Sequence, residues 1–503
     1  MRLAKLSALI LAGHAWAGIS PLEEGRRLYE NNQFQRARTV LEKALRADQS
    51  HAKVRYWLAY SCFALDDLEC ALAHFERLDE VMAKDPDYLF AASEVYTRQA
   101  RQLSEKLSSL PGSLARKHQH LSYRHSSSGD TDNALAELRE ALKANPRLPG
   151  PHLDAAEILW SLKRYDEAAK ELEDELRLAP RSFLANLRYG QHLLRSAKYR
   201  DAAPYLKIAV AYEKYPEAHQ LLAYAHEQSG NAAEAMAEVD AGLAAFPQDR
   251  DLLEMRRSLR SRHPLVKPAV PSQIPIRLRE EIPEPLALRA RLRKHPEDEE
   301  ALFWLNRIYS AGAAERFERL EKAAPDSAQV WLSKGLNAEF AADFTEAEVC
   351  FREALRRDGR RSGVRFSLGR VLLLQGRDEE GMRELREELK LSPYHHGAYY
   401  ELGAALVRKG DAAAGGPMLE RSLDLRSGFQ PTKLELAKAY LQLGKAAQSI
   451  PLLREVIRTS PQHETAHYLL YRAYRGTGEA QLAQRELEIH RRLLRSANSG
   501  AKN

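Results

Sequence analysis

Residues 331–355 read WLSKGLNAEFAADFTEAEVCFREAL, and the spacing within this stretch decides the fold. The small residue Gly335 is followed by a second small residue, Ala347, and then, one helical turn later, by the large apolar Phe351. These three positions, the marks of the repeat, recur every 34 residues. The first recurs at Gly335, Gly369, Gly403, Ala437 and Tyr471, the second, always small, at Ala347, Gly381, Gly415, Ser449 and Ala483, and the third, always large and apolar, at Phe351, Leu385, Leu419, Leu453 and Leu487. One structural unit is therefore repeated along this region.

The same period is present nearer the N-terminus. Ala134, Ala168 and Ala202 keep the 34-residue spacing, as do Leu138, Leu172 and Leu206 and the pairs Gly25/Ala59, Ala37/Ala71 and Leu41/Phe75. Small residues let two helices approach closely, and a large residue one turn later fills the space beside them. Proline ends a helix, and Pro325, Pro393 and Pro461 stand 68 residues apart, which is two periods. The pattern predicts antiparallel helix pairs.

The chain resembles the tetratricopeptide repeat (TPR) family, whose 34-residue unit carries W-x2-L-G-x2-Y, A-x3-F and P. Trp331, Gly335, Ala347 and Phe351 give the best match, and a second match is made by Ala156, Ala168, Leu172 and Pro180. The resemblance covers most of the chain. It implies an all-α solenoid of antiparallel helix pairs, in two superhelical segments, acting as a non-enzymatic scaffold that binds peptides or proteins.

The composition narrows the class of protein. The 503 residues include 76 Lys and Arg and 70 Asp and Glu, giving a net charge of +6, which is a mixed surface and not that of a nucleic-acid-binding polycation. Hydrophobic residues are 44% and charged residues 29%, so the chain should fold. We expect no nucleic acid among its partners, and the composition leaves the oligomeric state open.

The N-terminus has the features of an export signal. Arg2 and Lys5 precede an apolar run at 6–12, and an A-x-A site ends at Ala17. We expect a signal peptide over 1–17, cleaved after Ala17, and a periplasmic or secreted protein; a cytoplasmic protein with a frayed leader is the alternative. The apolar run is shorter than the ~20 residues that span a bilayer, so we expect no stable membrane insertion.

A longer repeat is superimposed on the first. Residues 89–213 match residues 302–426 with an offset of 213, and Arg139-Glu140-Ala141-Leu142 is identical to Arg352-Glu353-Ala354-Leu355. One multi-repeat block has therefore been duplicated. The predicted domains are an N-terminal solenoid at 18–262 with a capping helix at 250–262, a Pro-rich linker at 263–285, a C-terminal solenoid at 286–497 and a disordered tail at 498–503. Residues 86–114 and 286–327 fit the repeat least well.

The linker holds six prolines in 23 residues, so it should not be helical. It is either a passive tether or a segment packed on one solenoid, because Ile274, Ile276 and Leu278 alternate.

His463-Glu464-Thr465-Ala466-His467 matches the H-E-x-x-H motif in which two histidines bind zinc and the glutamate activates water. Glu486 is a conceivable third ligand. However, His467 holds the fourth position of its repeat, and His118, His152 and His219 hold that position in repeats without the motif. We therefore predict no enzyme, no metal site and no cofactor, and keep a zinc metalloprotease-like protein and a cytosolic TPR adaptor as alternatives.

Three cysteines exclude a disulfide-rich scaffold. Cys62 and Cys70 lie late in one helix and early in the next of one hairpin, within reach of a disulfide, and two buried thiols are the alternative. Cys350 precedes Phe351 and should be partly buried and unreactive.

Partner binding is expected on the first helices of the repeats, which line the concave surface in TPR proteins. The predicted groove of the C-terminal block consists of Phe366, Arg370, Leu373, Tyr400, Leu434, Lys438, Leu441, Tyr468, Arg472 and Arg475. The N-terminal block presents Tyr123, Leu153, Glu157, Trp160, Leu187, Gln191, Leu194, Tyr224 and Glu227. An apolar groove with cations and few acids suits a peptide or protein with apolar and acidic residues. The Lys/Asn/Asn/Lys/Arg set that clamps a terminal carboxylate in chaperone-binding TPR domains is not found.

Overall fold

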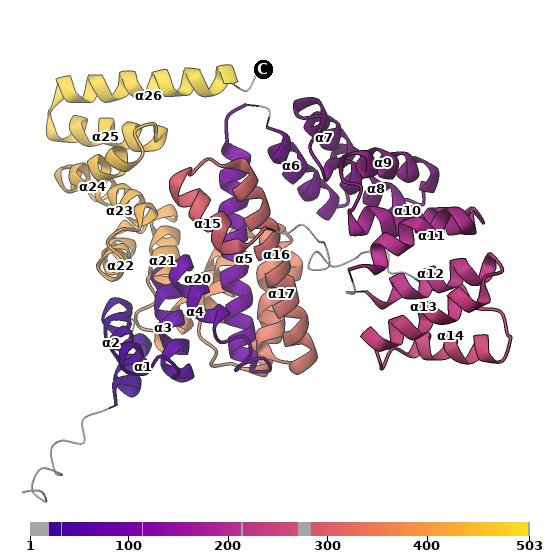
Figure 1. Ribbon diagram of the computed structural model, residues 1–503. Helices are drawn as coiled ribbons and strands as arrows, with labels where there is room; N and C mark the ends of the chain where they lie inside the picture. Colours follow the sequence, from indigo (N-terminus) through magenta and orange to yellow (C-terminus); the bar gives the residue numbers. More distant parts are fainter. Residues whose placement is uncertain (1–19, 32, 113, 213–214, 270–282, 501–503) are drawn as a thin grey trace, which may run out of the picture. The chain divides into compact units, whose positions relative to one another are not determined.

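The computed structural model describes residues 20–31, 33–112, 114–212, 215–269 and 283–500. These residues form 26 α-helices and no strand (Figure 1). Successive helices pack as hairpins, beginning with α1 (Pro21–Glu30) against α2 (Phe34–Ala47) and α3 (Ala52–Ala64) against α4 (Leu68–Glu76). The predicted all-α solenoid of helix pairs is confirmed.

The chain divides into two compact units. Unit 1 contains residues up to Ala92 together with Arg316 onward, and unit 2 contains Ser93–Glu315. Besides α1–α4, the helices of unit 1 are α17 (Ala328–Phe340), α18 (Phe344–Arg357), α19 (Val364–Leu374), α20 (Asp378–Leu391), α21 (His396–Arg408), α22 (Ala412–Leu425), α23 (Gln430–Gln442), α24 (Ala446–Thr459), α25 (Glu464–Thr477) and α26 (Ala480–Gly500). Those of unit 2 are α6 (Ala115–Ser127), α7 (Thr131–Ala144), α8 (Pro151–Ser161), α9 (Tyr165–Leu178), α10 (Phe183–Arg195), α11 (Tyr199–Val210), α12 (Pro216–Gln228), α13 (Ala232–Ala245), α14 (Arg250–Arg260) and α15 (Pro285–Lys294).

The 34-residue marks are the contact points within each hairpin. A Cβ atom on Gly335 of α17 would lie 2.4 Å from a ring carbon of Phe351 on α18. Phe351 is fully buried, so the absent side chain of Gly335 leaves the space that this ring fills. The second helix begins at a polar cap, where the Asp343 carboxylate accepts the backbone N–H of Glu346. Close approach and capping together explain why this sequence makes a hairpin here.

The two longest helices lie where degenerate repeats were predicted. Residues 86–114 and 286–327 were expected to contain degenerate repeats, but the first holds the single helix α5 (Pro86–Ser109) and the second holds α15 followed by α16 (Glu299–Ala323). Neither long helix contains a proline after its first residue that could end it. The unit boundary falls within both helices, after Ala92 in α5 and after Glu315 in α16.

The unit boundaries differ from the predicted domain boundaries at 262 and 286. Leu265, in the first part of the linker, is buried against Leu252 and Met255 of α14, so this part packs on a solenoid. The alternating residues Ile274, Ile276 and Leu278 lie outside the described residues, as does the predicted signal peptide over 1–17. At the other end α26 continues to Gly500, so the predicted tail at 498–503 begins inside a helix.

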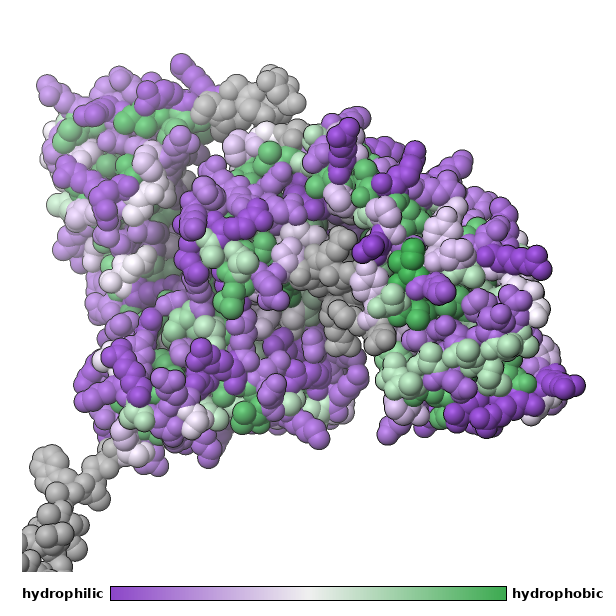
Figure 2. Space-filling view, viewed as in Figure 1, coloured by the Kyte–Doolittle hydropathy of each residue, from purple (hydrophilic) through white to green (hydrophobic). Residues whose placement is uncertain are grey.

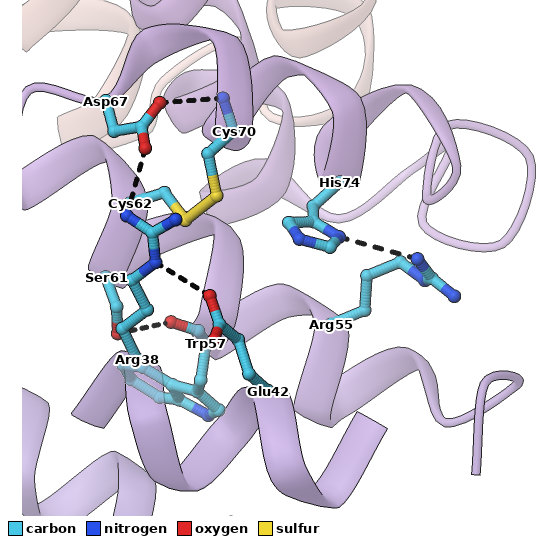
Figure 3. Close-up of a disulfide and its surroundings, with 9 residues drawn as sticks. All are labelled: Arg38, Glu42, Arg55, Trp57, Ser61, Cys62, Asp67, Cys70 and His74. Carbon is cyan, nitrogen blue, oxygen red and sulfur yellow. Dashed lines mark hydrogen bonds and ion pairs between the residues drawn. A yellow bond between two sulfur atoms is a disulfide. The ribbon is translucent and has the colours of Figure 1, made fainter. Parts of the chain in front are cut away.

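The α3–α4 hairpin is closed by a disulfide between Cys62 and Cys70 (Figure 3). The Asp67 carboxylate caps α4 by accepting the backbone N–H of Cys70, and it also pairs with Arg38 of α2 at 2.9 Å. Arg38 in turn donates to Glu42. The disulfide that the sequence left open is thus formed next to an ion-pair network that links two hairpins of unit 1.

Within the described ranges, none of the helices is both long enough and apolar enough to cross a membrane. The face of the molecule seen in Figure 2 is mostly hydrophilic, with hydrophobic residues in separate patches between hydrophilic ones.

Candidate partner-binding surfaces

The predicted groove residues of the C-terminal block lie on four first helices of unit 1. Each of these helices contacts the next one along the stack, so the residues are brought to one run of adjacent helices. The residues are Phe366, Arg370 and Leu373 on α19, Tyr400 on α21, Leu434, Lys438 and Leu441 on α23, and Tyr468, Arg472 and Arg475 on α25.

Leu373 does not belong to an accessible surface. Its side chain is buried with Met382, Leu385 and Leu402 in one core cluster. A Cβ on Gly381 would lie 2.8 Å from Leu373 Cγ, which shows that the leucine fills the space above this glycine. The prediction for Leu373 was wrong because this helix turns that side chain toward its own hairpin. The other nine residues are half-buried or exposed.

The middle of this surface contains acids that the prediction did not include. Arg370 pairs with Glu339 of α17 at 2.7 Å, and Lys438 pairs with Glu435 at 2.6 Å. Burial raises the pKa of Glu401 on α21, and the nearby cation Arg370 opposes that rise. The expectation of few acids was therefore incorrect, because each cation in the middle of the surface has a carboxylate close to it.

The α25 end differs from the middle. Tyr468 is 41% exposed, and Arg472 and Arg475 are exposed as well. Arg475 donates to the Tyr471 hydroxyl at 3.2 Å, and neither arginine has an ion pair within the described part of the chain. Tyr468 also lies beside His490 of α26, with ring centroids 5.2 Å apart. This end presents aromatic rings and two arginine charges together.

The corresponding surface of unit 2 is more closed. Leu153, Trp160, Leu187 and Leu194 are buried, so these four predicted positions are core residues. Glu157 accepts from Arg188 Nε at 2.7 Å and Nη2 at 3.2 Å, and the Arg188 guanidinium lies over the Trp160 ring. Tyr123 is exposed, and the remaining positions, Glu157, Gln191, Tyr224 and Glu227, are half-buried. Unit 2 therefore uses four of its nine predicted groove residues for core packing.

Unit 2 also contains a cavity of about 450 Å³ that sequence reasoning missed. Its polar lining is Arg116, Gln119, Glu175, Ser182, Glu300 and Arg307, and its apolar lining is Leu148, Pro149, Gly150, Leu153, Phe183, Leu184, Pro283, Phe303 and Trp304. Buried Glu175 accepts the backbone N–H groups of Gly150 and Leu153, and burial raises the pKa of this carboxyl. Only the tertiary structure brings residues 116 and 300 together, because no short-range spacing connects them.

The H-E-x-x-H residues are part of the repeat packing. His463 is the N-cap of α25, where its Nδ1 atom accepts the backbone N–H of Ala466. His467 Nδ1 lies 2.6 Å from Glu486 Oε2, and His467 Nε2 lies 3.0 Å from the Pro461 carbonyl oxygen. Both ring nitrogens of His467 thus face acceptors.

The His467–Glu486 pair is a repeated feature. Pairs with the same separation of 19 residues and Nδ1–Oε distances of 2.5–2.7 Å join His118 to Glu137, His152 to Glu171 and His219 to Glu238. Asp174 lies close to the His152 pair, so these three residues could present ligand atoms to a metal ion, but Asp174 is already paired with Arg177. Cys350 is buried, and burial raises its pKa to about 11, so this thiol is not a reactive nucleophile.

Family models agree with the repeat register. A model described as Tetratricopeptide repeat matches residues 22–88, 187–250, 332–396 and 434–488, and a second model with the same description matches residues 126–187. The chain belongs to the tetratricopeptide repeat family. No curated protein matches this TPR chain.

Solved structures that match the TPR chain each cover about a third of it. A structure titled MamA protein is 20% identical, with 35% of this chain and 96% of that chain covered and a TM-score of 0.31. YrrB, described as a TPR protein with an unusual peptide-binding site, is 16% identical, with coverage of 35% and 91% and a TM-score of 0.32. MamA 41-end from Desulfovibrio magneticus RS-1 is 19% identical, with coverage of 34% and 97% and a TM-score of 0.32.

Proposed function

We propose that this TPR protein is a non-enzymatic scaffold that binds a peptide or protein with apolar and acidic residues on the first helices α19–α25 of unit 1. The observation that carries the proposal is the α25 end, where exposed Tyr468 lies beside Arg472 and Arg475. Aromatic and arginine side chains are the residue types that contribute most to binding energy at protein interfaces.

The surface divides into two parts with different roles. Phe366, Tyr400, Leu434 and Leu441 are half-buried and supply apolar contact along the stack. Arg370 and Lys438 are already neutralised by Glu339 and Glu435, so a partner carboxylate would have to compete with those acids. We therefore expect the acidic groups of the partner to pair with Arg472 and Arg475, which form no ion pair among the described residues.

The non-enzymatic assignment is supported by the roles of the reactive residue types. His463 and His467 have structural hydrogen-bond partners, and Glu486 is occupied by His467. Zinc analysis of the purified protein tests this assignment. One tightly bound zinc ion per chain would contradict it, and absence of stoichiometric zinc is expected.

We place the scaffold in the cell envelope. The basic and apolar segment at 1–17 supports export, and the Cys62–Cys70 disulfide suits an oxidising compartment. N-terminal sequencing of the protein recovered from fractionated cells tests the location. A mature N-terminus at Gly18 in the envelope fraction is expected, and an intact Met1 in the cytoplasmic fraction would contradict the proposal.

Partner chemistry is tested with two labelled peptides of equal length, one alternating Leu with Glu and the other alternating Leu with Lys. We expect the acidic peptide to bind more tightly, and R472E/R475E to weaken its binding about tenfold or more, with little change in helix content. The matched control is R383E/R386E, which reverses two exposed arginines on the second helix α20. Equal binding of both peptides, or equal loss in both variants, would contradict the assignment of this surface.

A further inference from the structure

The two long helices α5 and α16 hold the same position in the two copies of the duplicated block. Each begins in the unit that contains the repeats following the other helix. With the offset of 213, Pro86 of α5 corresponds to Glu299 of α16, and Ser109 corresponds to Lys322. Yet the first residues of α5, up to Ala92, belong to the unit that contains α17–α26, and the first residues of α16, up to Glu315, belong to the unit that contains α6–α14. Each long helix begins against the repeats that follow the other one.

Contacts in unit 1 show this directly. Asp87 of α5 accepts from Gln329 Nε2 of α17 at 2.8 Å and from Arg361 Nη2 at 2.9 Å. The Arg361 guanidinium also lies over the Phe90 ring, which packs on the core cluster around Phe351. Just before α5, Asp79 accepts from Arg316 at 2.9 Å and from Arg319 at 2.8 Å. These partners are more than 230 residues apart in sequence.

Unit 2 contains the counterpart. Glu300 of α16 accepts from Arg116 of α6 through both oxygens, at 2.7 and 2.9 Å, and the Arg116 guanidinium lies over the Phe303 ring. Asn306 Nδ2 donates to the Ala100 carbonyl oxygen at 2.7 Å, and the rings of Tyr96 and Tyr309 meet edge to face. The Arg116 side chain is 6% exposed and the Glu300 side chain 34% exposed, so the pair is buried on the arginine side.

The two sets share one duplicated pair of contacting positions, Asp87 with Gln329 in unit 1 and Glu300 with Arg116 in unit 2. The 213-residue offset relates Asp87 to Glu300 and Gln329 to Arg116, as it relates Phe90 to Phe303. In unit 1 the acid comes from the first half of the chain and the donor from the second half, and in unit 2 these origins are reversed. The same contact is thus formed twice, and each half of the chain supplies the acid in one unit and the donor in the other. Two like partners that bind each other through equivalent surfaces form contacts of this kind.

We propose that residues 20–262 and 283–500 are mutual binding partners, which recognise each other through this exchange and stay together without the covalent connection between them. The cavity of unit 2 follows from the same exchange, because Arg116 and Gln119 line it from the first half and Phe303 and Trp304 from the second. The linker then raises the effective concentration of the halves but is not needed to hold them.

The test uses the full chain with a specific protease site inserted between residues 270 and 282. The protein is folded, cut to completion and analysed by native mass spectrometry and size-exclusion chromatography at micromolar concentration. We expect one 1:1 complex with the mass of the uncut protein. Two separately eluting fragments would overturn the proposal, and this arm involves no substitution that could prevent folding.

A charge-reversal set tests which contacts hold the cut halves. R116E and E300R should each weaken association of the cut chain at least tenfold, and R116E/E300R should restore it. The control set is E140K, K143E and E140K/K143E, an exposed pair within α7, for which no change is expected. Circular dichroism of the uncut variants confirms that they fold. Folded single variants whose cut halves associate as tightly as wild type would overturn the assignment of this interface.

Discussion

Glu157 and Arg188 of unit 2 and Arg370 and Glu401 of unit 1 occupy equivalent positions, 213 residues apart, with acid and base in opposite order. In unit 2 the Arg188 side chain is 1% exposed and held through two nitrogens. In unit 1 the Arg370 side chain is 39% exposed and pairs with Glu339 on the neighbouring helix. The two copies of the block have kept the same helix positions. The arginine at one of these positions is buried in unit 2, and the arginine at the other is partly exposed to solvent in unit 1.

The same comparison extends to the cavity. Leu153 and Ser182 line it in unit 2, and their counterparts in unit 1 are Phe366 and His395, whose rings lie 4.5 Å apart. The buried carboxylate beside them is kept, since Glu175 accepts the N–H of Gly150 and Glu388 accepts that of Gly363. Backbone anchoring is thus common to both units, while the side chains beside the carboxylate are larger in unit 1.

Removing the buried arginine should have the largest effect. R188A removes the buried guanidinium and leaves the half-buried Glu157 carboxylate without its partner, so it should destabilise the protein by about 3–5 kcal/mol. R370A should cost less, about 0.2–1 kcal/mol, because solvent reaches that site. Urea unfolding measures both. Equal costs would show that the two units treat this position alike.

The glycines on the first helix of a repeat, where the second helix approaches most closely, should contribute equally to the stability of both units. A Cβ at Gly190 or at its counterpart Gly403 would lie 2.7 Å from a leucine of the facing helix, so G190A and G403A should each cost about 1–3 kcal/mol. Gly416 has open space at its Cβ position, so G416A should stabilise by about 0.5–1 kcal/mol through helix propensity. Thermal unfolding of the three variants tests whether the packing marks were kept in both copies.

Acid should weaken unit 2 through a buried histidine. Burial lowers the pKa of His120 to about 4, and the neighbouring Arg124 adds to this effect. A histidine whose folded pKa is depressed takes up protons first in the unfolded state, so its stabilisation is lost as the pH falls from about 6.5 toward 4. The loss should be about 2 kcal/mol at pH 5.

The measurement is urea unfolding at pH 7 and at pH 5. In H120Q the difference between the two pH values should be smaller by that amount. The control is H51Q, a histidine at the start of α3 in unit 1. An unchanged difference in H120Q would show that His120 is not held neutral in the folded state.

The smallest effects concern the H-E-x-x-H residues. H467A should cost about 1–2 kcal/mol by removing the bond to Glu486, and the equivalent H219A in unit 2 should cost a similar amount. E464Q should change the stability by less than about 0.5 kcal/mol. Differential scanning calorimetry separates these values. A large loss in E464Q alone would show that the motif does more than pack the repeat.

Local spacing was sufficient to predict the hairpins and the structural role of His467, because each depends on residues within one or two repeats. For Cys62 and Cys70 it predicted only that the two thiols lie within reach of each other, and the structure shows the disulfide.

Local spacing was not sufficient at Leu373, where a shift of a few tens of degrees around the helix decides between groove and core. The acids Glu339 and Glu435 were missed as partners because their positions next to Arg370 and Lys438 depend on how side chains extend across and along helices.

The sequence by itself determined the repeat and its duplication, since a 34-residue period of small and large residues leaves few ways for two helices to pack closely. Only the tertiary structure shows on which set of repeats each of the long helices α5 and α16 begins. The helices α5 and α16 hold the same place in the two copies of the duplicated block, so the period alone does not say which repeats each of them packs on. Periodicity is the same in both cases, and the choice rests on long-range contacts such as Arg116 with Glu300 and Asp87 with Gln329, which no local pattern encodes.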